Sequence, residues 1–257
     1  MNGKIHDLPE DDYFAHPALS QSQAKVLLAN PARYKWELDN PRTDDNPVFA
    51  IGHAAHTLIL GTGAPIATID VDARRGKAWT ESADEARADG CVPLTRKEAE
   101  AVHGMRDAVY AHPGARAFLE LDGQSEKTVL WDDEDVPCRA RLDRLSDGLI
   151  LDVKTAADAS PAGFAKSAAN YGYDVQQVAY ARAVQAATGE APPFVFLVVE
   201  KAPPHFVALY TLPPEATERG ERRWLDALDL FKQCTATDTW PGYGDDVQTL
   251  PWPRWAA

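Results

Sequence analysis

The hydrophobic positions change their spacing along the chain, from a helical period near the N-terminus to strand-like runs in the middle. Helical spacing and capping residues predict helices over about 20–39 (a second one opening at Pro31), 47–60, 95–110, 161–169, 174–188 and 214–233. Apolar runs predict strands over 127–131, 136–146, 149–155, 194–200 and 206–212. Residues 62–94 are polar and predict an irregular region, and the Pro/Trp-rich segment 250–255 predicts an extended tail. Helices, then strands, then a helical crossover into more strands are typical of an α/β fold with a mixed sheet.

The sequence shows no internal linker, so we predict one domain over residues 1–257. Its parts are an N-terminal helical part (1–61), an irregular loop region (62–94), and a core of helix, sheet and C-terminal helix (95–257). No stretch approaches the roughly 18 consecutive apolar residues of a membrane helix, and the first residues lack the apolar core of a secretory signal. We therefore expect a cytoplasmic protein without a membrane partner. The three cysteines are far apart, which argues against a disulfide framework and against a four-thiolate metal site.

The charge of the chain is unevenly distributed. The net charge of −13 comes from 26 basic and 39 acidic residues, and such a surplus disfavours non-specific binding to nucleic acid. Residues 135–182, however, hold six basic and six acidic side chains and are neutral. A neutral region inside an acidic shell is compatible with an anionic ligand, particularly with the help of a metal ion.

Residues 138–155 contain the most informative pattern. Asp147-Gly148 between two strand-like runs is a preferred two-residue hairpin turn, which pairs Ser146 with Leu149 and sets Asp143 opposite Asp152. One face of this hairpin then carries Arg139, Arg141, Asp143, Asp152 and Lys154, with Arg141 opposite Lys154. The other face carries a predicted core layer of Cys138, Ala140, Leu142, Leu151 and Val153.

This register places two carboxylates side by side. The two carboxylates repel each other, and a divalent cation such as magnesium or manganese bound between them would turn this repulsion into a net attraction. Lys154, on the same face, can neutralise a phosphate or orient an attacking water. The alternative is a solvated surface hairpin whose acidic residues pair with Arg141 and Arg144. If Asp132–Asp135 form a four-residue loop, Glu126 opposes Arg141 and also faces this site.

Four motifs match one family in order and spacing. Asp143, eight intervening residues and Asp152-Val-Lys154-Thr155 resemble the PD-(D/E)XK nuclease superfamily, with Leu142 in place of the family's proline. Residues 52–60 (GHAAHTLIL) are similar to the G-x-A-x-H-x-L-x-L helix of its RecB-like branch, and Gln176 with Tyr180 to that branch's Q-x-x-x-Y helix. Residues 13–22 and 30–34 are similar to the start of the RecE-type nuclease domain (exodeoxyribonuclease VIII). The resemblance covers residues 8–210.

The resemblance implies a restriction-endonuclease-like core and a role for each matching residue. The implied metal ligands are His56, Asp143, Asp152 and the Val153 carbonyl, with Glu126 as a further candidate. Lys154 is the implied catalytic cation, and Gln176 and Tyr180 contact the DNA backbone or orient Lys154; a plain helix-packing role for these two is the alternative. The candidate DNA-binding residues are Ser20, Ser22, Arg74, Lys77 and Arg141. The basic cluster around Arg74 and Lys77 is equally compatible with a solvated loop.

The activity that the resemblance implies is Mg²⁺-dependent degradation of linear double-stranded DNA, with Mn²⁺ as a substitute. Digestion would run 5′ to 3′ and leave 3′ overhangs for a single-strand annealing protein of the RecT type in phage-type recombination. Enzymes of this type form rings that thread DNA, so we expect a homo-oligomer, a trimer or tetramer. The alternatives are a repair or defence nuclease of the Cas4 or AddB type, which usually has four cysteines, and a non-catalytic DNA-binding protein on the same fold.

Overall fold

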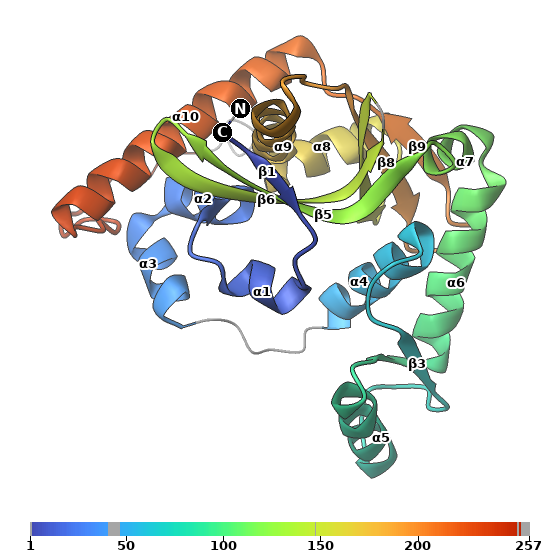
Figure 1. The fold of residues 1–257 in the computed structure, drawn as a ribbon. Coiled ribbons are helices and arrows are strands. Elements are labelled where there is room, and N and C mark those ends of the chain that lie inside the picture. Colours follow the sequence, from blue (N-terminus) through green and yellow to red (C-terminus); the bar gives the residue numbers. More distant parts are fainter. Residues whose placement is uncertain (1, 41–46, 147, 251, 253–257) are drawn as a thin grey trace.

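The computed structural model describes residues 2–40, 47–146, 148–250 and 252. Its centre is a mixed sheet of seven strands, in the order β1-β5-β6-β7-β8-β9 with β2 beside β6, and helices cover both faces (Figure 1). β7 and β8 are parallel, whereas β5–β6, β6–β7 and β8–β9 are antiparallel. The fold is therefore the predicted mixed α/β architecture. Among the described helices, none has both the length and the apolar character needed to cross a bilayer.

The sheet strands are β1 (Lys4–His6), β2 (Leu19–Ser20), β5 (Gly123–Asp133), β6 (Val136–Ser146), β7 (Leu149–Ala156), β8 (Phe194–Glu200) and β9 (Val207–Tyr210). The helices are α1 (Glu10–Ala15), α2 (Gln21–Ala29), α3 (Pro31–Asp39), α4 (Pro47–Leu60), α5 (Lys77–Ala88), α6 (Arg96–Ala111), α7 (Pro113–Leu119), α8 (Pro161–Tyr171), α9 (Tyr173–Thr188) and α10 (Pro214–Thr237). The helix starts follow local chemistry: Ser20 and Thr95 each form a capping box with a residue three positions on, and Pro31 opens α3. All the predicted helices and strands are present, with ends shifted by a few residues.

The prediction of an irregular region over 62–94 is wrong. This segment forms β3 (Ile66–Ile69) and β4 (Val92–Thr95), a parallel two-stranded sheet, with α5 between them. The signal for α5 is three buried side chains at helical spacing, Trp79, Ala83 and Ala86, which the surrounding charged residues obscure. In Figure 1 this unit extends from the main body below α6. The short elements β1, α1 and β2 were also not predicted, and most of the segment 250–255 lies outside the described residues.

The hydrophobic core has two parts, one on each side of β8. Phe194, Phe196 and Val198 pack with α2, α9 and α10, whereas the alternating Val195, Leu197 and Val199 pack with α4 and α6. The predicted single core layer of the hairpin is wrong in this respect. Its five residues are buried, but Cys138, Ala140 and Leu142 belong to the first part of the core, and Leu151 and Val153 to the second. The difference arises because the alternation of β6 is interrupted near Asp143: Leu142 and Leu145, three residues apart, both pack in the first part of the core, and Glu126, opposite Asp143, has a left-handed φ of 55°.

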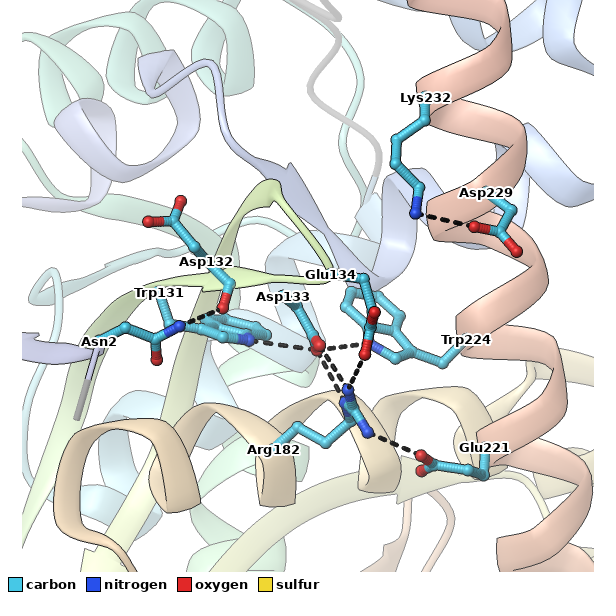
Figure 2. A network of polar contacts seen from close by, with 10 residues as sticks. All are labelled: Asn2, Trp131, Asp132, Asp133, Glu134, Arg182, Glu221, Trp224, Asp229 and Lys232. Carbon is cyan, nitrogen blue, oxygen red and sulfur yellow. Dashed lines mark hydrogen bonds and ion pairs between the residues drawn. The ribbon is translucent and has the colours of Figure 1, made fainter.

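A buried carboxylate anchors the turn between β5 and β6. Asp133 accepts hydrogen bonds from the indole N–H groups of Trp131 (3.3 Å) and Trp224 (2.9 Å) and pairs with Arg182 on α9 (Figure 2). Glu134 and Asp135 both have left-handed φ (47° and 67°), which makes a two-residue turn with Asp133 paired to Val136. The predicted four-residue loop is therefore wrong. Glu126 lies between the pairs Ser125–Arg144 and Lys127–Leu142, opposite Asp143 and not opposite Arg141.

Candidate active site

The two acidic residues of the hairpin lie where β6 and β7 separate. The ladder between these strands contains the pairs Ser146–Leu149, Leu145–Ile150 and Arg144–Leu151, which confirms the predicted register, and it ends there. One step further, the Val153 N–H donates to the Asp143 carboxylate (N to Oδ2, 2.7 Å). Because the backbones have separated, the Asp143 side chain occupies the gap. The predicted opposition of Arg141 and Lys154 does not form, since the β6–β7 ladder ends at Arg144–Leu151; on the other edge of β6, Arg141 pairs with Thr128 of β5.

Asp152 and Lys154 form a buried ion pair on β7. Asp152 is fully buried; its Oδ1 accepts a hydrogen bond from the Gln176 side chain on α9 (2.6 Å), and its Oδ2 contacts the Lys154 ammonium. The ammonium also lies over the ring of Tyr173, 4.8 Å from its centre. Tyr173 was not predicted as a site residue, although it precedes Gln176 by three positions and so shares its helix face.

A metal-ligand group adjoins this ion pair. His56 on α4, Glu126 on β5 and Asp143 on β6 present one ligand atom each, and these atoms lie within 4.8 Å of one another. His56 Nδ1 is 3.4 Å from Asp143 Oδ2. Two carboxylates and an imidazole are ligands that bind divalent cations such as Mg²⁺ or Mn²⁺. Of the five predicted ligands, three form this group. Asp152 lies outside it, and the described contact of Val153 is through its N–H and not through its carbonyl.

Burial controls the protonation of the site. It raises the pKa of both Asp143 and Asp152 to about 6, against the opposing effect of the Lys154 charge. Burial also lowers the pKa of His56 to about 4, an effect that the Lys154 charge reinforces. His56 is therefore neutral at pH 7, with a lone pair available for a metal. Burial alone would lower the pKa of Lys154, but Asp152 and Asp143 raise it, so the ammonium stays charged.

The remaining predicted residues of this region have structural partners. Tyr180 is buried against Phe194, and burial raises its pKa well above the usual value. Arg141 is held by Glu126 (Nε to Oε2, 2.6 Å) and by the Leu8 carbonyl (2.9 Å). Ser20 caps α2, and its hydroxyl lies 3.0 Å from that of Ser22. Both serines line a cavity of about 670 Å³ beside Arg139, away from the metal-ligand group.

The basic cluster predicted around Arg74 lies in the β3–α5–β4 unit. Arg74 is paired with Glu98 (2.9 Å), and its guanidinium covers the ring of Trp79 (5.1 Å from its centre). Lys77 begins α5, is 85% exposed and pairs loosely with Glu81 (3.6 Å). Lys77 thus lies on a helix and not in a loop, and Arg74 has a structural ion pair; a role of either residue in DNA binding stays a prediction.

Comparisons with known proteins show the family and the fold. A profile of the family described as PDDEXK-like domain of unknown function (DUF3799) matches residues 20–251. A crystal structure of a candidate exonuclease from Eubacterium rectale aligns over 96% of this chain and 97% of its own, with a TM-score of 0.66 and 13% identity. A phage-related exonuclease from Haemophilus somnus 129PT aligns over 87% and 97%, but its TM-score is only 0.38, at 13% identity. No curated protein matches the sequence.

Proposed function

Because the chain belongs to the family of PDDEXK-like domains, we propose that it is a metal-dependent nuclease that degrades linear double-stranded DNA from its ends. The observation that carries this proposal is the group of His56, Glu126 and Asp143 directly beside the Asp152–Lys154 pair. An anionic phosphodiester resists attack until its charge is neutralised. This site combines a position for a divalent cation with a permanent ammonium, and the side chains that form it are buried or half-buried.

The residues present fit Mg²⁺, with Mn²⁺ as a substitute. The ligand set is mainly hard carboxylate oxygen, and the neutral His56 adds a nitrogen donor. When bound, such a cation acts as a Lewis acid on a phosphate oxygen and lowers the pKa of a water molecule. Burial makes Asp143 and Asp152 costly to ionise, so the site favours a ligand that supplies positive charge.

The protein's own groups orient the reaction. Gln176 and Lys154 fix the two oxygens of Asp152, and the Val153 N–H fixes Asp143, so neither carboxylate can rotate freely. The Lys154 ammonium, steadied by the Tyr173 ring, is placed to stabilise the negative charge that develops on the phosphate during attack. Tyr180 lies one turn after Gln176 on the same helix and contacts its side chain, so it would help to hold Gln176 against Asp152.

The finer features of the proposal rest on the resemblance to RecE-type nucleases. They are 5′-to-3′ digestion that leaves 3′ overhangs, supply of those overhangs to an annealing protein of the RecT type, and assembly into a trimeric or tetrameric ring in the cytoplasm of a bacterial or phage-infected cell. A ring offers a reason why a chain of net charge −13 can act on DNA. The acidic surface would face outward, and the neutral stretch 135–182 would face the channel.

The test uses linear duplex DNA labelled separately at each 5′ and 3′ end, with covalently closed circular DNA as the control. We expect loss of the 5′ label first in Mg²⁺ or Mn²⁺, no digestion of the circle, and no activity in excess chelator. Calcium should support binding with little turnover, since its looser coordination positions the attacking water poorly. Cleavage of circles would indicate an endonuclease of the same superfamily, and binding without cleavage in every metal would indicate a non-catalytic DNA-binding protein.

A further inference from the structure

The junction of α8 and α9 brings a second lysine toward the site. Gly172 joins the two helices in a left-handed conformation (φ 64°), and the Lys25 side chain from α2 crosses directly above it. A Cβ at this glycine would come within 2.7 Å of Lys25 Cδ, so a side chain here would displace the lysine, and the left-handed φ also favours glycine. The Lys25 ammonium donates to the Tyr171 carbonyl (3.0 Å), while the Lys154 ammonium lies over Tyr173. The two ammonium groups therefore flank a three-residue segment, which spans at most about 10 Å.

The charge of Lys25 is not balanced by a carboxylate. Among the described residues, no acidic group forms an ion pair with it; its one hydrogen bond is to a carbonyl. The two carboxylates close enough to influence it are already occupied: Asp152 by Lys154, and Asp174 by Arg223 (3.1 Å) and Arg219 (3.5 Å). Burial and the neighbouring Lys154 charge lower the pKa of Lys25 to about 8. A half-buried ammonium in this position is unfavourable by itself and becomes favourable beside an anion.

We propose that Lys25 binds the phosphate next to the scissile one, so that Lys25 and Lys154 hold two successive phosphates of the same strand. The inference rests on the proposed nuclease function and adds a positioning residue to it. Lys154 acts at the reacting phosphate, whereas Lys25 contributes equally to binding of substrate and transition state. Removal of its charge should therefore raise KM and leave kcat nearly unchanged.

The experiment compares wild type with Lys25→Met, which keeps the aliphatic stem over Gly172, and with Lys25→Arg, which keeps the charge. Duplex binding is followed by fluorescence anisotropy in Ca²⁺ over a series of monovalent salt concentrations. Loss of one phosphate contact should reduce the slope of log K against log salt by about 0.9. Going from about 50 to about 200 mM salt should then weaken wild type about 3.5-fold more than Lys25→Met. Lys25→Arg should retain the wild-type slope.

Lys166→Met is the matched control, because Lys166 is an exposed lysine on α8 that the site does not use. Its slope should equal that of wild type. A wild-type slope and a wild-type KM in Lys25→Met would overturn the inference. An equal loss of slope in Lys25→Met and Lys166→Met would also overturn it, because it would indicate only the effect of net charge on DNA binding. If Lys25→Met is unstable, Lys25→Gln gives the same test. Failure of the nuclease proposal is recognised separately, as absence of wild-type cleavage, and the Ca²⁺ binding slopes then still decide the role of Lys25.

Discussion

Asp143→Asn should make the metal-free protein more stable while it abolishes metal-dependent cleavage. The carboxylate lies in the gap between β6 and β7, largely buried, with only 14% of its side chain exposed. Its hydrogen bond from the Val153 N–H can pass to the amide oxygen of asparagine, so the substitution removes a charge and leaves the local geometry in place. The negative charge of Asp143 thus destabilises the metal-free fold and serves to bind a cation.

The magnitude follows from the pKa of Asp143. Burial raises it from 3.8 to about 6, and each pKa unit corresponds to about 1.4 kcal/mol, so the ionised carboxylate destabilises the metal-free fold by up to about 3 kcal/mol. A raised folded-state pKa means that the folded protein binds the extra proton. The destabilisation is therefore absent below about pH 4, grows as the pH rises, and is complete above about pH 6. A metal at 100 times its Kd would return about 2.7 kcal/mol to wild type alone.

Urea unfolding in excess chelator, followed by circular dichroism at several pH values, measures this difference. The control is Asp226→Asn, which neutralises an exposed carboxylate on α10 and should change stability little at any pH. We expect the curves of wild type and Asp143→Asn to coincide near pH 4 and to diverge toward pH 8, with the gap narrowing when Mg²⁺ replaces the chelator. A variant less stable than wild type at pH 8, or a gap that does not depend on pH, would refute the reasoning.

Three other substitutions test single contacts. Lys154→Ala should lower the single-turnover cleavage rate constant at least about 100-fold; wild-type cleavage would mean that the site is misplaced. Asp133→Ala removes the acceptor of two indole N–H groups and one partner of Arg182, which keeps Glu221, and should lower the urea unfolding free energy by about 1–3 kcal/mol, with cleavage at low temperature retained. Gly148→Val places a β-branched residue at φ 76° and should cost at least about 1–2 kcal/mol, whereas Gly148→Asn should be milder; equal urea midpoints would argue against a strained turn.

The sequence was most informative where local chemistry decides the structure. Capping boxes at Ser20 and Thr95 fix two helix starts, and the predicted starts at about 20 and 95 agree with them within one residue. The β6–β7 register was also predicted, because Gly148 supplies a left-handed turn position and a one-residue slip would expose the apolar face. Asp147, the other turn residue, lies outside the described residues.

The sequence-based predictions are wrong where contacts between distant parts of the chain determine the local structure. The Glu134–Asp135 turn contains no glycine, and two left-handed residues there are held by the buried Asp133, whose partners come from α9 and α10. No local signal distinguishes this two-residue turn from a four-residue loop. The shorter turn moves Glu126 from the predicted position opposite Arg141 to a position opposite Asp143, two residues along β6. Because a shift by two residues keeps a side chain on the same face of the sheet, Glu126 still faces the site.

The end of the β6–β7 ladder also decides how the acidic motif works. In a continued ladder, Asp143 and Asp152 would be equivalent neighbours with one cation between them. Separation of the strands gives them different environments: Asp143 joins His56 and Glu126, while Asp152 is held by Gln176 and Lys154. The Lys154 charge acts on both carboxylates, so a cation held by His56, Glu126 and Asp143 would share the site with a fixed ammonium. The cation and the ammonium would then supply two positive charges to one phosphate.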